Sequence, residues 1–110
     1  MLGHIAAFSH HVLFCLKHPD SLADRAQLLA ALQALAQIEV VRGMHISLPA
    51  APGHDPVVDR NYDLSLLVFF DSIEDEKTYQ SHALHQKFIQ ENAALLGSVR
   101  VFDSFSQNSN

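Results

Sequence analysis

The stretch YDLSLLVFFD, residues 62 to 71, is the clearest strand in this sequence and decides the fold. Successive side chains of a strand point to opposite faces of its sheet, and here both faces are apolar through the middle. A strand of this kind has to be covered on both faces. One face carries Leu64, Leu66, Val68 and Phe70, and the other carries Ser65, Leu67 and Phe69.

The chain before this strand predicts a strand, a helix, a second strand and a loop. FSHHVLFCLK, residues 8–17, is β-branched and aromatic enough for a strand. Ser21 and Asp24 resemble a capping box, and leucines then recur at helical spacing to about residue 37. Residues 38–48 read as a strand in which a glycine, Gly43, indicates a bulge or a bend. The proline-rich residues 49–61 form a loop, which serves either as a connector or in function.

The chain after this strand predicts one more helix and one more strand. Ser72 and Asp75 form the second capping signal. The helix that follows is expected to break near Ala83 and to end at Gly97. Residues 99–105 are the last strand. The order strand, helix, strand, strand, helix, strand is the split βαβ arrangement, an α+β fold with a four-stranded antiparallel sheet and helices on one face.

That architecture leaves the other face of the sheet without cover. We expect this open face to carry Phe14, Leu16, Leu67 and Phe69. An exposed apolar sheet is a strong signal for association. The simplest solution is a homodimer in which two open sheet faces meet around a two-fold axis.

Length, charge and cysteine content narrow the class of protein. We expect a single domain over residues 1–110, with its core at about 8–106. The formal net charge is −5, and only seven Lys and Arg are present, without clustering. Nucleic acid is therefore not an expected partner. The lone Cys15 reads as a small buried side chain, and with no apolar run of membrane length and no leader we expect a cytoplasmic protein with no membrane partner.

The residues that could carry chemistry lie around the second helix. Tyr79 and His82 are three residues apart and share a helix face, whereas His85 joins them only if the helix bends. His11 lies in the middle of the first strand. A phenol and an imidazole base in an apolar pocket can deprotonate a carbon acid or orient a carbonyl group. The catalytic candidates are Tyr79, His85 and His11, and the substrate-binding candidates are His82, Leu64, Leu13 and Phe88, with no cofactor and no metal expected.

HHVLFCLK, NYDLSLLVFFDS and TYQSHALHQKF resemble the stress-responsive A/B barrel family, the Dabb domain. The resemblance covers about Ser9 to Phe105 and implies a ferredoxin-like βαββαβ fold that forms a dimeric α/β barrel. A plant member of the family is a polyketide cyclase that performs an aldol condensation. By this resemblance Tyr79 would bind the substrate carbonyl and His85 would act as general base, with His11 in the same pocket.

In the same comparison, His82 would orient the segment. The chain departs from the family pattern at two positions. Leu64 stands where the cyclase has a pocket histidine, and Ala83 stands where the family signature usually has proline. The implied function is a pocket that binds or converts a small aromatic or polyketide-like molecule.

Three other functions stay open. The first is a structural or stress-related dimer module with a filled interior. The second is a metal site in which His82 and His85 bind zinc together with His11 or His45. The third is a relationship to the monooxygenases of the same fold, although the chain has no Trp and lacks their signatures.

Overall fold

The computed structural model describes residues 6–50 and 55–107, which form four strands and three α-helices. Two short 3₁₀ turns follow α1 and α3. The elements in chain order are β1 (Phe8–Leu16), α1 (Leu22–Ala34), η1 (Leu35–Gln37), β2 (Gly43–Ser47), β3 (Leu64–Phe70), α2 (Ile73–Ser81), α3 (Ala83–Asn92), η2 (Ala93–Leu95) and β4 (Leu96–Phe105).

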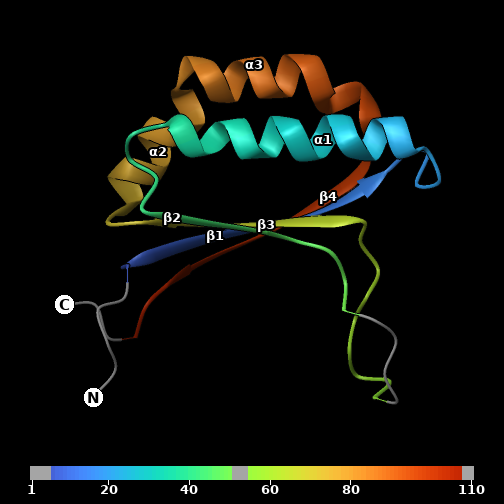
Figure 1. Ribbon diagram of the computed structural model, residues 1–110. Helices are drawn as coiled ribbons and strands as arrows, with labels where there is room; N and C mark the ends of the chain where they lie inside the picture. Colours follow the sequence, from blue (N-terminus) through green and yellow to red (C-terminus); the bar gives the residue numbers. More distant parts are fainter. Residues whose placement is uncertain (1–5, 51–54, 108–110) are drawn as a thin grey trace.

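The strands form one antiparallel sheet in the order β2-β3-β1-β4. The helices lie together on one face of it, and the other face has no helix over it (Figure 1). This is the predicted βαββαβ fold, with the clearest strand of the sequence, β3, beside β1 in the centre of the sheet. The first strand of the chain, β1, therefore pairs directly with β3, and Phe8 lies opposite Phe70.

The core lies between the sheet and the helices. Along β1 the buried positions alternate strictly, and Phe8, Val12, Phe14 and Leu16 all point toward the helices. The prediction that Phe14 and Leu16 lie on the open face is therefore wrong. They have the same parity as Phe8, and each is about 95% buried. Leu67 and Phe69 do lie on the open face, as predicted, because they alternate with the buried side chains of β3.

Serine side chains cap the N-termini of the two predicted helices, α1 and α2. Ser21 Oγ accepts a hydrogen bond from the backbone N–H of Asp24 at 3.2 Å, and Ser72 Oγ accepts one from Asp75 at 3.1 Å. The predicted break is present: His82 has φ −64° and ψ 145°, an extended conformation that separates α2 from α3. α3 thus leaves α2 in a new direction, and its side chains no longer follow the faces of α2.

Two predicted boundaries are wrong. Gly97 does not end a helix: it lies in β4, where a Cβ would sit 3.4 Å from the carbonyl oxygens of Cys15 and Leu16. The pairing of β1 with β4 shifts between those two residues, and a Cβ at position 97 would just reach van der Waals contact with the β1 backbone. β2 is also shorter than predicted. Residues 38–42 form a turn closed by the Val41 N–H and the Ile38 carbonyl, and the register from Gly43 to Ser47 shows no bulge.

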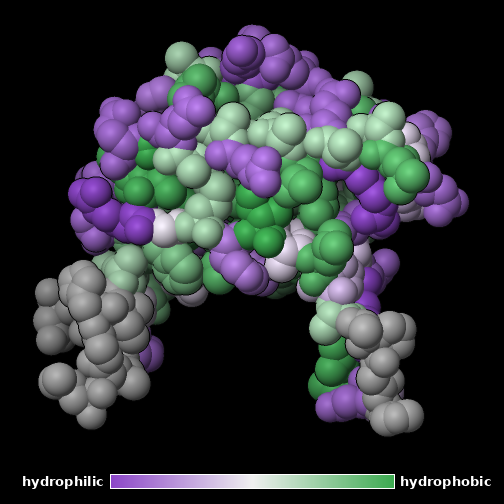
Figure 2. Space-filling model, viewed as in Figure 1, coloured by the Kyte–Doolittle hydropathy of each residue, from purple (hydrophilic) through white to green (hydrophobic). Residues whose placement is uncertain are grey.

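The described parts of the connection between β2 and β3 run beyond the sheet on the side of the open face (Figure 1). Arg100 Nη2 of β4 donates to the carbonyl of Asn61 at 2.9 Å and so ties the end of this connection to the sheet. Residues 51–54 of the predicted loop lie outside the described residues. Figure 2 shows hydrophilic side chains over the outer surface of the helical layer and hydrophobic ones where that layer meets the sheet. None of the described helices is long and apolar enough to cross a membrane.

Candidate functional site

A cavity of about 250 Å³ lies between the sheet and the helical segment α2–α3. This volume is just below the usual range for small-molecule sites, roughly 300–1,000 Å³. Its wall is mainly apolar, and its mouth opens beside Ile89, Val99 and Val101, which are about half exposed. Four polar or titratable side chains reach this wall: His10, Tyr79, Gln80 and His85.

Tyr79 is the most deeply buried of these side chains, with 1% of its surface exposed. Its ring packs against Phe70 at 5.0 Å and against His85 at 4.8 Å between centroids. Burial is the main cause that raises the pKa of the Tyr79 phenol, and the nearby Glu76 carboxylate raises it further. The phenol therefore keeps its proton at neutral pH and can donate a hydrogen bond to a ligand.

His85 has an unsatisfied nitrogen. Its side chain is buried against Tyr79 and Phe88, and its Nδ1 has no hydrogen-bond partner among the described residues. Burial lowers the pKa of the imidazole, and the nearby His10 lowers it further. Burying a polar group without a hydrogen-bond partner typically lowers the free energy of unfolding by about 1–3 kcal/mol. Unpaired groups of this kind are expected where a site awaits a ligand.

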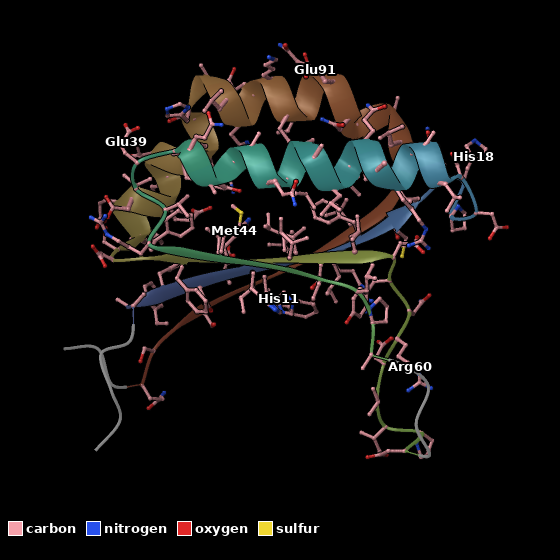
Figure 3. The ribbon with its side chains drawn as sticks, viewed as in Figure 1. His11, His18, Glu39, Met44, Arg60 and Glu91 are labelled. Atoms are coloured by element: carbon pink, nitrogen blue, oxygen red, sulfur yellow. The ribbon has the colours of Figure 1, made fainter. Side chains whose placement is uncertain are left out.

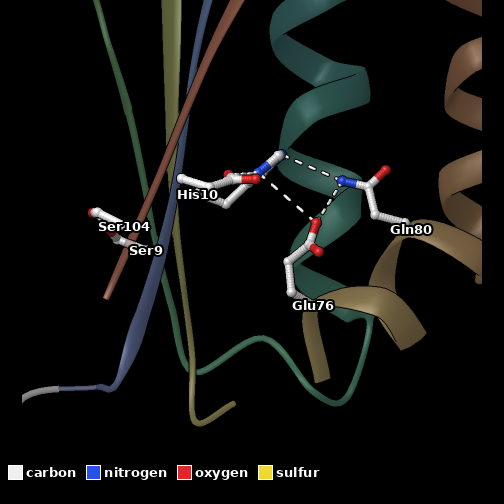
Figure 4. Close-up of polar contacts among 6 residues, drawn as sticks. Ser9, His10, Glu76, Gln80 and Ser104 are labelled. Atoms are coloured by element: carbon white, nitrogen blue, oxygen red, sulfur yellow. Dashed lines mark hydrogen bonds and ion pairs between the residues drawn. The ribbon is translucent and has the colours of Figure 1, made fainter. Parts of the chain in front are cut away.

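His10 belongs to a polar network at the side of the cavity (Figure 4). Its Nδ1 lies 2.6 Å from Asp103 Oδ1 and 3.9 Å from Glu76 Oε2. Gln80 Nε2 donates to Glu76 at 2.8 Å and lies 3.5 Å from His10 Nε2. These contacts fit a His10 whose Nδ1–H donates to Asp103 and whose Nε2 faces Gln80. Asp103 thus orients His10 and would stabilise it after it accepts a proton.

The structure brings together three of the predicted site residues. Tyr79, His85 and Phe88 all line the cavity, because the break at His82 rotates α3 relative to α2. Leu64 is buried beneath the helices but is not among the residues that line the cavity. The side chain of His82 accepts a hydrogen bond through Nδ1 from the Leu84 N–H and caps α3.

The other two predicted residues lie on the wrong face. His11 and Leu13 point to the open face, away from Tyr79 and His85, and Figure 3 shows His11 on that side of the sheet. Alternation along β1 is the physical reason, since neighbouring residues of a strand point in opposite directions. His10 takes the place in the pocket that the sequence analysis gave to His11.

Sequence reasoning missed His10, Gln80 and Asp103. A signal for His10 was present, because it has the same parity as Phe8 and Val12, whose side chains form the core. No such signal marked Asp103: it becomes visible only through the register in which β4 pairs it with His10.

The zinc site that was left open as an alternative is not assembled. His11 and His45 lie on the open face, whereas His85 is on the other side of the sheet, and His82 already uses Nδ1 as a helix cap. Within residues 6–50 and 55–107, one group of three potential metal ligands lies close together, namely His10, Glu76 and Asp103, within 4.8 Å of one another. The hydrogen bond from His10 to Asp103 already satisfies two members of that group.

A βαββαβ chain that forms a four-stranded antiparallel sheet with helices on one face defines a ferredoxin-like α+β domain. The Stress Responsive A/B Barrel Domain (Dabb) matches residues 8–106, and the chain belongs to this family. No curated protein sequence matches it.

Solved structures share the fold at low identity. A Dabb family protein from Mesorhizobium loti is 18% identical, with a TM-score of 0.76 over 92% of this chain and 97% of that one. A dimeric ferredoxin-like protein of unknown function from Thermobifida fusca is 19% identical, with a TM-score of 0.73 over 96% of each chain. The hydroxynitrile lyase of Passiflora edulis is 16% identical, with a TM-score of 0.78 over 97% of this chain and 99% of the lyase.

Proposed function

We propose that this protein is a homodimer whose cavity binds a small aromatic or polyketide-like carbonyl compound and transfers a proton to or from it. The observation that carries this proposal is the set of hydrogen-bonding groups in one mainly apolar cavity. His85 has a buried, unpaired nitrogen, Tyr79 has a protonated phenol, and His10 is held by Asp103. A cavity of about 250 Å³ also counts against a module with a filled interior.

The chemistry follows from the properties of the three groups. The Tyr79 phenol donates a hydrogen bond to the carbonyl oxygen and stabilises negative charge as it develops there. An imidazole in its neutral form, that of His85 or that of His10, removes a proton from the carbon beside the carbonyl. The proton then rests on that imidazole, and the electron pair becomes the enolate. If His10 is the base, the Asp103 carboxylate stabilises the imidazolium that forms.

The fold of this chain supports acid–base catalysis by analogy. One structural relative is a hydroxynitrile lyase, so the fold can host a lyase. The polyketide-like ligand class follows from the family resemblance and from the apolar wall. By the family resemblance the plant cyclase has a pocket histidine where this chain has Leu64, so this cavity lacks that polar group.

The open face supports the dimer. It carries Leu13, Leu67 and Phe69 on its inner strands, and β4 adds Phe102, which is 55% exposed. Apolar surface of this kind is usually buried against a partner. Related structures from Thermobifida fusca and Bacteroides fragilis are dimeric, and a second copy is therefore the partner that we propose.

A thermal-shift screen tests the pocket. Aromatic acids, lactones and short polyketide-like compounds are each added to the wild-type protein and to the variants Tyr79→Phe and His85→Ala. A true ligand at about 100 times its Kd stabilises the folded state by roughly 2.7 kcal/mol. We expect the variants to lose this stabilisation, and we expect His11→Asn, on the opposite face, to keep it. Compounds that bind then enter a proton-exchange assay in D₂O.

Two results would overturn the proposal. One is that no compound of these classes raises the melting temperature of the wild-type protein. The other is that every compound that does so also stabilises the Tyr79→Phe and His85→Ala variants to the same extent. Either result would favour the dimer module without chemistry.

A further inference from the structure

The open face carries an unusual row of side chains at its centre. Leu67 of β3 pairs with His11 of β1 on one side and with His45 of β2 on the other. Phe102 of β4 pairs with His11 and ends the row. Two imidazoles therefore flank an apolar side chain in the middle of the surface that we propose as the dimer interface. Neither imidazole has a hydrogen-bond or ion-pair partner among the described residues.

No carboxylate lies among the open-face positions of the four strands. Alternation and register leave three kinds of titratable side chain there: the imidazoles of His11 and His45, the Cys15 thiol and the Arg100 guanidinium. Arg100 forms an ion pair at 3.4 Å with Asp59, an exposed residue of the β2–β3 connection. The Asp59 carboxylate therefore compensates the charge of Arg100. Nothing on the sheet itself can neutralise a protonated His11 or His45.

The covered face gives the opposite arrangement. There His10 lies within 4 Å of two carboxylates, Asp103 and Glu76, so a positive charge on that imidazole would be compensated. A positive charge on His11 would not. Burying an uncompensated cation is costly, and the usual response is that the group stays neutral or the burial does not occur.

We infer that the dimer forms with His11 and His45 uncharged and that mildly acidic pH dissociates it. This inference rests on the proposed homodimer and adds its regulation. A two-fold dimer repeats the row on the facing sheet, so four imidazoles share one apolar interface. Imidazole groups change charge between pH 5 and 8, which places the transition in an accessible range.

The size of the effect follows from proton linkage. One pH unit below the ordinary imidazole value, each imidazole that the dimer keeps neutral weakens dimerisation by roughly tenfold. Two such groups, one His11 from each copy, give a rise in the dimer Kd of roughly 100-fold between pH 7.5 and 5.5. A contribution from His45 would make the rise larger.

Sedimentation equilibrium over a range of protein concentrations tests this at pH 7.5, 6.5 and 5.5. The wild-type protein is compared with His11→Asn, with His45→Asn and with His18→Asn, a control in which an exposed histidine outside the sheet is replaced. Circular dichroism at each pH confirms that the chain stays folded. We expect the dimer Kd of the wild type and of His18→Asn to rise at least 100-fold, and that of His11→Asn to rise at least tenfold less.

The outcomes separate the two proposals. A wild-type chain that is monomeric at pH 7.5 would overturn the homodimer and this inference with it. A wild-type dimer whose Kd changes less than threefold over this pH range would overturn the pH response and leave the homodimer standing. A dimer that dissociates in acid equally in the wild type and in both open-face variants would overturn the assignment to His11 and His45.

Discussion

Two neighbouring histidines show how differently the two faces of one sheet can be used. His10 points to the helices, where it meets Asp103, Glu76 and the ring of Tyr79. His11, the next residue, points to the open face, where no described side chain bonds to it. The covered face supplies packing and polar partners within one chain. The open face supplies apolar surface and imidazoles without counter-charges on the sheet, and it is the surface that we propose a second copy covers.

The largest expected difference between the faces concerns adjacent phenylalanines. Phe70 is fully buried beneath the helices, and Phe69 lies on the open face. Phe70→Ala removes a core ring and should lower the free energy of unfolding by about 3–5 kcal/mol. Phe69→Ala should leave the isolated fold close to wild type and act mainly on dimerisation. Urea unfolding at several protein concentrations separates the two effects, because only dimer loss depends on concentration.

The comparison would break if both variants lost the same free energy at protein concentrations low enough to give monomers. Equal losses would mean that the open face is covered within the single chain. Leu13→Ala serves as a second probe of that face, since its side chain is directed away from the helices.

The second prediction uses the two histidines themselves. His10→Ala removes the partner of Asp103 and leaves the Glu76 carboxylate, whose residue is 8% exposed, without the imidazole that lies 3.9 Å from it. We expect a loss of about 1–3 kcal/mol of unfolding free energy, the usual cost of breaking a part-buried polar contact. His11→Ala should change the stability of the monomer by less than about 0.5 kcal/mol. Urea unfolding of both variants at low protein concentration provides the test, and a larger loss for His11→Ala would contradict the assignment of faces.

The sequence predicted the fold well because its strongest signals are local. The apolar run of β3, the two serine caps and the order of elements were all readable without distant contacts. The break at His82 was predicted too, and it is the feature that brings His85 against Tyr79. These features depend on residues within one or two turns of each other.

The parts that failed depend on register and parity. Assigning His11 rather than His10 to the pocket is an error of one residue, and in a strand such an error reverses the face of the side chain. Asp103 was missed because its role depends on how β4 pairs with β1, 93 residues away in sequence. The end of the second helix was misplaced because Gly97, which in sequence looks like a helix stop, lies in β4 next to the shift in the β1–β4 register.

The third prediction concerns the loss of stability at low pH that His85, on the covered face, should cause. Burial and the nearby His10 lower the pKa of His85, so the folded state resists protonation there. Above the ordinary imidazole value, both folded and unfolded states hold a neutral His85 and its titration has no effect on stability. As the pH falls below that value, the unfolded chain binds a proton that the folded chain does not, and stability is lost.

Replacing His85 with glutamine should therefore reduce the loss of unfolding free energy between pH 7.5 and 5.5. Urea unfolding at the two pH values measures this loss for the wild type, for His85→Gln and for His18→Gln. The control variant should lose as much as the wild type, because His18 is exposed. An identical loss in all three proteins would show that His85 is protonated as easily in the folded chain as in the unfolded one.

The smallest expected signal is spectroscopic and comes from Tyr79. Burial raises the pKa of its phenol, so the group stays protonated in the folded chain at pH values where an exposed tyrosine ionises. Stability should consequently fall as the pH rises above about 10, because only the unfolded chain releases this proton.

The chain has two tyrosines, which makes the phenolate absorbance at 295 nm easy to assign. Up to the pH at which the fold is lost, Tyr79→Phe should give the same rise in absorbance as the wild type, whereas in concentrated guanidinium it should give about half. If the folded Tyr79→Phe variant already gave half the rise of the folded wild type, the Tyr79 phenol would ionise in the folded chain like a phenol in water. The proposed role of Tyr79 as a buried, protonated hydrogen-bond donor would then be wrong.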